Sequence, residues 1–269
     1  MPILKTKSAT IYYESQGSGP HILLIHAGIA DSRMWSYEFQ ALATQFHVTR
    51  FDLPGFGQSS FTGEVFSYTM MINELLDHLA IDQTYLFAAS FGGKLALDFA
   101  IEMPNRTLGM TLQSPAIGDW AFSDELQQYD AQEEELLNQK SYEQAAQLNY
   151  ETWILRNRQP DTIDSQLKAL IINMQMTAFT KLEIELPVEE TPDSSKRSSC
   201  LDQLCVPTLV LIGSEDVPDF QQIADFLHKT IPLAEKIIVP HAAHLANLEA
   251  PVFVEHSVIP FFSKLIDNH

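Results

Sequence analysis

One serine in this chain stands where a reactive hydroxyl would be placed. Ser90 comes where a strand-like stretch ends and a helix-like stretch begins, and the small residues Ala88 and Gly92 lie two positions before and after it. A sharp strand-to-helix turn needs such residues, because the strand and the helix nearly touch there. The turn would set the hydroxyl at a helix N-terminus, whose dipole and free N–H groups favour negative charge. An ordinary N-cap serine also fits this pattern, so the interpretation depends on a base and an acid elsewhere.

Candidate acids and bases follow two later strand-like runs. Glu215 and Asp216 come after the run that ends at Gly213, and His241 and His244 come after the last such run. A carboxylate can orient an imidazole, and the imidazole can take the proton of an attacking serine. Serine, acid and histidine also occur in the chain order of the nucleophile-elbow architecture. These residues therefore predict a nucleophilic triad, with the choice of acid and of histidine still open.

Two backbone N–H groups are candidates for an oxyanion hole. One belongs to the loop His26-Ala27-Gly28, which follows the apolar run 21–27, and the other is that of Phe91, directly after the serine. Two such donors would stabilise a tetrahedral intermediate, and losing one typically costs ~3 kcal/mol of that stabilisation.

The elements that must position these residues are short apolar runs alternating with helix-like patterns. The expected strands are 21–27, the start of 46–59, 84–90, 108–116, 206–216 and 235–244. The expected helices around the serine are 66–81 and 91–103. This alternation predicts an α/β fold, a mostly parallel central sheet with helices on both faces. In such a sheet chemistry gathers at the carboxyl ends of the strands, where the candidate residues are placed.

The middle of the chain breaks the alternation. It shows helical patterns without convincing strands, at 123–140, 141–157 and 161–179. It also carries much of the negative charge and ends in a return loop rich in Pro, Ser and charged residues. We interpret 119–196 as a helical cap inserted into an α/β core, and that core as formed by 1–118 and 197–269.

Composition excludes several classes of partner. The net charge of −19 over 269 residues would be repelled by nucleic acid and by anionic lipid. No apolar run approaches the ~18 residues of a membrane helix, and the N-terminus lacks the features of a signal peptide. A disulfide between Cys200 and Cys205 is possible, but two cysteines are no disulfide framework. We expect a cytoplasmic monomer or homodimer that acts on a small molecule, with no nucleic-acid or membrane partner.

With these residues in view, the chain resembles the α/β-hydrolase superfamily over nearly its whole length. The stretches HAGIADSRMW, DLPGFGQS, AASFGG, GSED and AAHLANLEAP resemble, in order, the family's oxyanion loop, glycine-rich turn, nucleophile elbow, acid loop and histidine loop. Carried over to this chain, the resemblance selects Ser90 as nucleophile, Asp216 as acid and His244 as base. It places the oxyanion donors at Gly28 and Phe91.

Four positions depart from the family's pattern without removing a reacting group. Ala27, Ala88 and Ala243 replace glycines, and Pro54 replaces an arginine. Among subgroups, the chain is similar to small carboxylesterases and enol-lactonases.

The resemblance implies a serine hydrolase that cleaves a small, largely apolar ester or lactone through an acyl-enzyme, with no metal or organic cofactor. The helical insertion would roof the pocket. Its candidate lining residues are Trp35, Trp120, Trp153 and Met174, although core packing is the commoner role for side chains of these types.

Several alternatives stay open. Carbon–carbon bond hydrolases, cofactor-free haloperoxidases and acyltransferases share the serine triad, whereas dehalogenases and epoxide hydrolases of this fold place an aspartate where Ser90 stands. His241 and His244 alone do not predict a metal site, because a single loop pair lacks further ligands. A ligand-binding receptor with slow or no turnover is the alternative of another class, and turnover above ~1 per second on a good substrate would argue against it.

Overall fold

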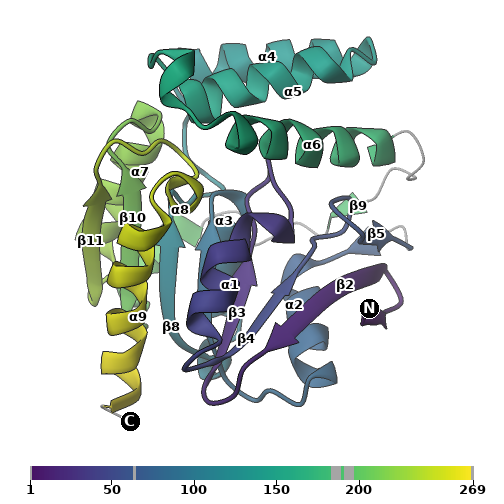
Figure 1. Cartoon of the computed structure of the whole chain (residues 1–269). Helices are drawn as coiled ribbons and strands as arrows, with labels where there is room; N and C mark the ends of the chain where they lie inside the picture. Colours follow the sequence, from purple (N-terminus) through teal and green to yellow (C-terminus); the bar gives the residue numbers. More distant parts are fainter. Residues whose placement is uncertain (1, 63–64, 183–188, 191–196, 268–269) are drawn as a thin grey trace.

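The computed structural model describes residues 2–62, 65–182, 189–190 and 197–267 (Figure 1). The strands of its main sheet are β1 (Ile3–Lys5), β2 (Ala9–Gln16), β3 (His21–Ile25), β4 (His47–Phe51), β5 (Ser60–Phe61), β7 (Thr84–Ala89), β8 (Thr107–Gln113), β10 (Thr208–Gly213) and β11 (Ala234–Val239). They lie in the order β1-β2-β4-β3-β7-β8-β10-β11, and β5 pairs with β2. All pairs from β4 to β11 are parallel, while β2 runs antiparallel to β1, β4 and β5. A separate parallel pair joins β6 (Val65–Phe66) to β9 (Glu189–Glu190).

The central strands are buried along their whole length. Every residue of β3, β7 and β10 is buried, which explains why these strands are continuous apolar runs rather than alternating patterns. The helices that flank the sheet are α1 (Ser36–Leu42), α2 (Tyr68–His78), α3 (Phe91–Glu102), α7 (Pro218–Thr230), α8 (Ala246–Glu249) and α9 (Pro251–Asp267). Helices α1 and α9 pack together on one face, and α2 and α3 pack together on the other (Figure 1). The predicted α/β fold with a mostly parallel sheet is therefore confirmed.

The structure differs from the prediction mainly at strand ends. The predicted strand 235–244 ends at Val239, because Pro240 has no N–H to donate and His241 adopts a φ of 59°. The antiparallel strands β1 and β2 were not predicted. β2 is only partly buried near its end, so it lacks the continuous apolar run that marks the central strands.

Three further helices stack over one end of the sheet (Figure 1). They are α4 (Asp124–Asn138), α5 (Tyr142–Tyr150) and α6 (Ser165–Leu182), and a π-helical turn, η3 (Glu151–Leu155), directly follows α5. Ser123 caps α4, and Asp219 of α7 accepts hydrogen bonds from its N–H and its hydroxyl, both at 2.7 Å. This contact anchors the start of α4 to the helices that flank the sheet.

Two further features concern the surroundings of the protein. Cys200 and Cys205 are exposed free thiols. Among the described helices, none has the length and apolar character to cross a membrane.

Candidate active site

Ser90 lies on a strained turn between β7 and α3. Its backbone has φ 52° and ψ −117°, a conformation that costs a non-glycine residue about 1–3 kcal/mol. Hydrogen bonds hold it there, since its N–H donates to the Gln113 carbonyl at 2.9 Å and its carbonyl accepts from the Ala116 N–H at 3.0 Å. The hydroxyl makes no capping hydrogen bond to α3. Ser90 is therefore not an ordinary N-cap, and its hydroxyl remains available for chemistry.

Gly92 allows this turn to form. A Cβ at this position would lie 2.5 Å from the carbonyl oxygens of both Ile25 and His26, far inside normal contact. The close neighbour is thus the carboxyl end of β3, the adjacent strand, and not the strand that precedes Ser90. A small residue at this position was correctly predicted from the sequence. The need for it was attributed to contact with the strand before Ser90, whereas the contact is with the end of β3.

Asp216 and His244 form a buried pair. The His244 Nδ1 lies 3.0 Å from one Asp216 carboxylate oxygen and 3.1 Å from the other, and both side chains are almost fully buried. The Val217 N–H donates to the same carboxylate at 2.7 Å. With Nδ1 engaged by the aspartate, Nε2 is the ring nitrogen left to take a proton.

The imidazole of His244 is held between two aromatic rings. Its centroid lies 4.6 Å from that of Trp153 in η3 and 4.5 Å from that of Phe220 in α7. The Trp153 carbonyl also accepts a hydrogen bond from the His244 N–H at 3.2 Å. One residue from the region of α4–α6 therefore fixes both the ring and the backbone of this histidine.

A second link joins the same region to the histidine loop. Arg158 pairs with Glu249 at 2.6 Å and donates to the His241 carbonyl at 2.9 Å. Glu249 in turn accepts from the Ala243 N–H at 2.8 Å. These contacts hold the chain on both sides of His244.

Gly28 and Phe91 lie next to each other beside the serine. A Cβ on Gly28 would be 3.5 Å from the Cβ of Phe91, and within the described residues neither N–H donates to another protein group. The loop before Gly28 is fixed by His26, whose Nδ1 donates to the Ala27 carbonyl at 2.8 Å and whose Nε2 accepts from the Leu53 N–H at 2.9 Å. Burial lowers the pKa of His26, which keeps the ring neutral, as this hydrogen bonding requires.

One cavity of about 550 Å³ brings these groups together. Ser90 and His244 line it, and so do Gly28 and Phe91. An acyl-transfer centre needs a nucleophile, an oriented base and paired N–H donors around one space, and this cavity supplies all three. Among the described residues, no group of three or more His, Cys, Asp and Glu side chains forms a metal site.

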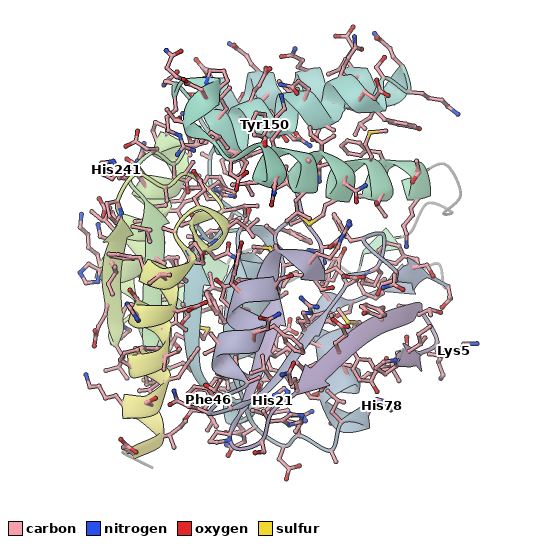
Figure 2. All side chains as sticks on the ribbon, in the orientation of Figure 1. Lys5, His21, Phe46, His78, Tyr150 and His241 are labelled. Carbon is pink, nitrogen blue, oxygen red and sulfur yellow. The ribbon has the colours of Figure 1, made fainter. Side chains whose placement is uncertain are left out.

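The two alternatives left open by the residues alone lie elsewhere. His241 is exposed, at the outer edge of the molecule (Figure 2), and its N–H donates to Ser214. Glu215 is also exposed and accepts from the Ser214 hydroxyl at 3.1 Å. The structure thus places Asp216 and His244 at the site.

The sequence profile of the alpha/beta hydrolase fold matches residues 20–251. The chain belongs to this family. A pimeloyl-[acyl-carrier protein] methyl ester esterase of Nitrosomonas europaea is 24% identical over 248 residues, covering 90% of this hydrolase and 96% of the relative. A thermophilic esterase from Thermogutta terrifontis superposes with a TM-score of 0.82 at 24% identity, over 98% of this chain and 99% of that one. The enol-lactonase from Burkholderia xenovorans LB400 superposes with a TM-score of 0.80 at 20% identity, over 97% and 100% of the two chains. The expected family is confirmed, and the expectation of an ester-cleaving hydrolase agrees with the named relatives.

Of the four predicted pocket residues of this hydrolase, one lines the cavity. Trp153 lines the cavity, whereas Trp35, Trp120 and Met174 do not. Trp35 is fully buried and packs against Phe87 inside the core, with the ring centroids 4.6 Å apart. Trp120 packs 5.8 Å from Phe226, and the Met174 sulfur accepts from the Asp31 N–H at 3.4 Å. Residue type alone did not reveal which way these side chains face.

Most of the lining was not predicted. The apolar part of the wall includes rings and aliphatic side chains from the core and from α4 and α6, namely Phe56, Phe61, Tyr68, Phe122, Leu126, Leu137, Ala178, Phe179 and Phe220. Phe220 carried a usable signal, since it falls in the first turn of the helix after the acid. A polar part of the wall consists of Tyr129, Asp130, Glu133 and Gln175, and no motif pointed to it.

A buried carboxyl group is hydrogen-bonded to the histidine loop. Glu38 of α1 is 1% exposed, and one of its oxygens accepts from Asn247 Nδ2 at 3.2 Å. Its other oxygen has no hydrogen-bond partner among the described residues. Asn247 also exchanges hydrogen bonds with Gln113, at 3.1 and 2.9 Å. Burial raises the pKa of Glu38 from 4.5 to about 8, so this side chain is mostly an uncharged acid at neutral pH.

Proposed function

We propose that this hydrolase cleaves small, largely apolar carboxylic esters, including lactones, through an acyl-enzyme on Ser90. One observation carries the proposal. Ser90, on its strained turn, lines the same mostly apolar cavity as His244, and Asp216 holds the Nδ1 of that histidine. Such a constellation performs nucleophilic acyl transfer with an activated serine.

In the acylation half-reaction, the Ser90 oxygen attacks the ester carbonyl carbon and its proton passes to His244 Nε2. The Asp216 carboxylate stabilises the imidazolium that forms. The N–H groups of Gly28 and Phe91 hold the oxyanion of the tetrahedral intermediate. The carbon–oxygen bond to the leaving alcohol then breaks, and the alcohol oxygen takes the proton from His244. In a lactone that alcohol stays attached to the acyl chain.

In the deacylation half-reaction, water replaces the alcohol. His244 takes one proton of the water as its oxygen attacks the acyl carbon. Collapse of the second tetrahedral intermediate breaks the bond to the Ser90 oxygen, which recovers the proton from His244. The carboxylic acid leaves, and the residues return to their starting state without a cofactor.

We also propose that 119–196 acts as a cap over a core formed by 1–118 and 197–269. Side chains of α4, α6 and η3 line the cavity that holds Ser90, which supports a role for this segment in shaping the substrate site. The exposed free thiols of Cys200 and Cys205 support action in a reducing compartment, for which we propose the cytoplasm.

The test is hydrolysis of p-nitrophenyl esters of increasing acyl length by the wild type and by Ser90→Ala. We expect turnover that disappears in Ser90→Ala, and a length optimum that measures the cavity. His241→Ala is the control, because that side chain lies outside the site. Absence of both ester turnover and labelling of Ser90 by a fluorophosphonate would refute the proposal. Labelling without turnover on any ester or lactone would instead favour a carbon–carbon bond hydrolase or a transferase.

A further inference from the structure

Part of the cavity wall formed by α4 and α6 is polar. Tyr129, Asp130 and Glu133 come from α4, and Gln175 comes from α6. The phenylalanine rings that line much of the remaining wall provide no hydrogen-bonding groups. A substrate that fills the cavity therefore meets polar groups that belong neither to the triad nor to the oxyanion hole.

A fully buried asparagine organises this wall. Asn149 of α5 donates to Glu133 at 2.6 Å and to the Gln175 side-chain oxygen, and it accepts from the Tyr129 hydroxyl. Both N–H groups and the oxygen of its side-chain amide therefore have partners. The network connects all three helices and restrains the side chains that line this part of the cavity. Because Asn149 donates to Glu133, that carboxyl group is held as an acceptor.

In this network one hydrogen-bond donor lacks an acceptor and one carboxyl group lacks a cation, among the described residues. Gln175 is only 2% exposed, and its oxygen is taken by Asn149, while its side-chain nitrogen has no partner among the described residues. This nitrogen is not fully enclosed by protein atoms, and its residue lines the cavity, so a bound substrate can supply the missing acceptor. Glu133 pairs with no Lys or Arg in the described part of the chain. Burial raises its pKa although Asn149 donates a hydrogen bond to it, as expected for a carboxyl group that lacks a cation.

We propose that this wall binds an uncharged group that both accepts and donates hydrogen bonds, a carboxamide or a hydroxyl, at the end of the substrate remote from the ester. The Gln175 nitrogen would donate to the oxygen of that group, and Glu133 would accept its N–H or O–H. Two neighbouring carboxylates, Asp130 and Glu133, would repel a substrate that ends in a carboxylate. This inference rests on the proposed esterase function and assigns a substrate class to the same site.

The test compares four phenyl esters of one acyl length that differ only at the remote end. The ends are a carboxamide, an isopropyl group of similar shape, a carboxylate and an ammonium group. We expect kcat/KM for the carboxamide to exceed that for the isopropyl ester about tenfold or more, because the carboxamide would form two hydrogen bonds that the isopropyl group cannot form. We expect the carboxylate ester to be the poorest substrate.

Two variants assign the preference to the wall. In Gln175→Met, the carboxamide-to-isopropyl ratio of kcat/KM should fall toward one, and taking the ratio within each variant cancels any loss of folded enzyme. In Glu133→Gln, which retains an acceptor for Asn149, the relative kcat/KM on the carboxylate ester should rise. Gln166→Met is the control, because Gln166 lies exposed on the same helix as Gln175, and its ratios should equal those of the wild type.

The outcomes separate this inference from the proposed function. Equal, Ser90-dependent hydrolysis of all four esters would overturn the polar-wall inference and leave the esterase intact. A preference for the ammonium ester would also overturn it, because the carboxylates would then act as a cation site. No hydrolysis of any of the four, together with no labelling of Ser90, would overturn both.

Discussion

The buried acid beneath the histidine loop makes the stability of this hydrolase depend on pH in a calculable way. Glu38 has a pKa of about 8 in the folded protein against an ordinary value of 4.5. Folding at neutral pH therefore requires proton uptake at this group. Because the folded pKa is the higher one, the contribution of Glu38 is fully present below pH 4.5 and is lost as pH rises toward 8.

The magnitude follows from linkage. Between these two pKa values the free energy of unfolding falls by about 1.4 kcal/mol per pH unit, since the folded state holds one more proton than the unfolded state. At pH 7 the accumulated cost is about 3 kcal/mol, a large part of the stability of a typical domain. Glu38→Gln keeps an oxygen for Asn247 and places an N–H where the neutral acid carries its O–H. We therefore expect the variant to match the wild type near pH 4.5 and to exceed it by about 3 kcal/mol at pH 7.

Urea unfolding followed by tryptophan fluorescence, at intervals from pH 5 to pH 8, measures this difference. His21 acts in the opposite direction, because burial lowers its pKa to about 3 and its contribution is lost as pH falls below 6.5. It lies at the end of the sheet far from α4–α6 (Figure 2), and it is the same in both proteins, so it cancels in the comparison. A stability difference that does not change with pH would refute the reasoning, even if Glu38→Gln were more stable throughout.

Three further predictions concern the site. His244→Ala should lower kcat/KM on the best ester by about a thousandfold or more, as loss of a triad member does, while His241→Ala should leave it unchanged; similar losses in both would contradict the assignment. Gly92→Ala should lower the free energy of unfolding by about 1–3 kcal/mol, since its Cβ would overlap two carbonyl oxygens, while Gly28→Ala, whose Cβ meets only ordinary contact, should unfold like the wild type in urea. Trp153→Leu should lower kcat/KM about tenfold by loosening the imidazole and should shift the pH–rate profile; an unchanged profile would show that the ring does not position His244.

The proposed reacting residues could be located from the sequence because each follows a strand that is recognisable from its apolar run. Ser90, Asp216 and His244 come after β7, β10 and β11, whose apolar runs stand out in the sequence, and parallel strands deliver their carboxyl ends to one edge. The end of β11 was harder to predict, because the local geometry at Pro240 and His241 decides where this strand stops. β1 and β2 were not predicted, because strands at the half-exposed edge of a sheet need no continuous apolar run.

The rest of the site depends on packing across helices, which spacing along the chain does not encode. Tyr129 and Glu133 share a face of α4 because they are four residues apart, but their meeting with Gln175 requires Asn149 on a third helix. Trp35 and Trp153 are the same residue type, yet one fills the core and the other lines the cavity. Which of the two environments each tryptophan occupies depends on the positions of the surrounding helices and strands.

The hydrogen bond from the His244 N–H to the Trp153 carbonyl limits how this enzyme can be recombined with its relatives. Replacing only the proposed cap, 119–196, by that of a relative would no longer guarantee a carbonyl in place for that N–H, and it would remove the Arg158 guanidinium that pairs with Glu249. The recipient core would retain its histidine, with Asp216 and Phe220 beside it, but would lose the contacts that Trp153 and Arg158 provide. We expect a working chimera to need the stretch 153–158 and the loop 241–249 from the same parent protein.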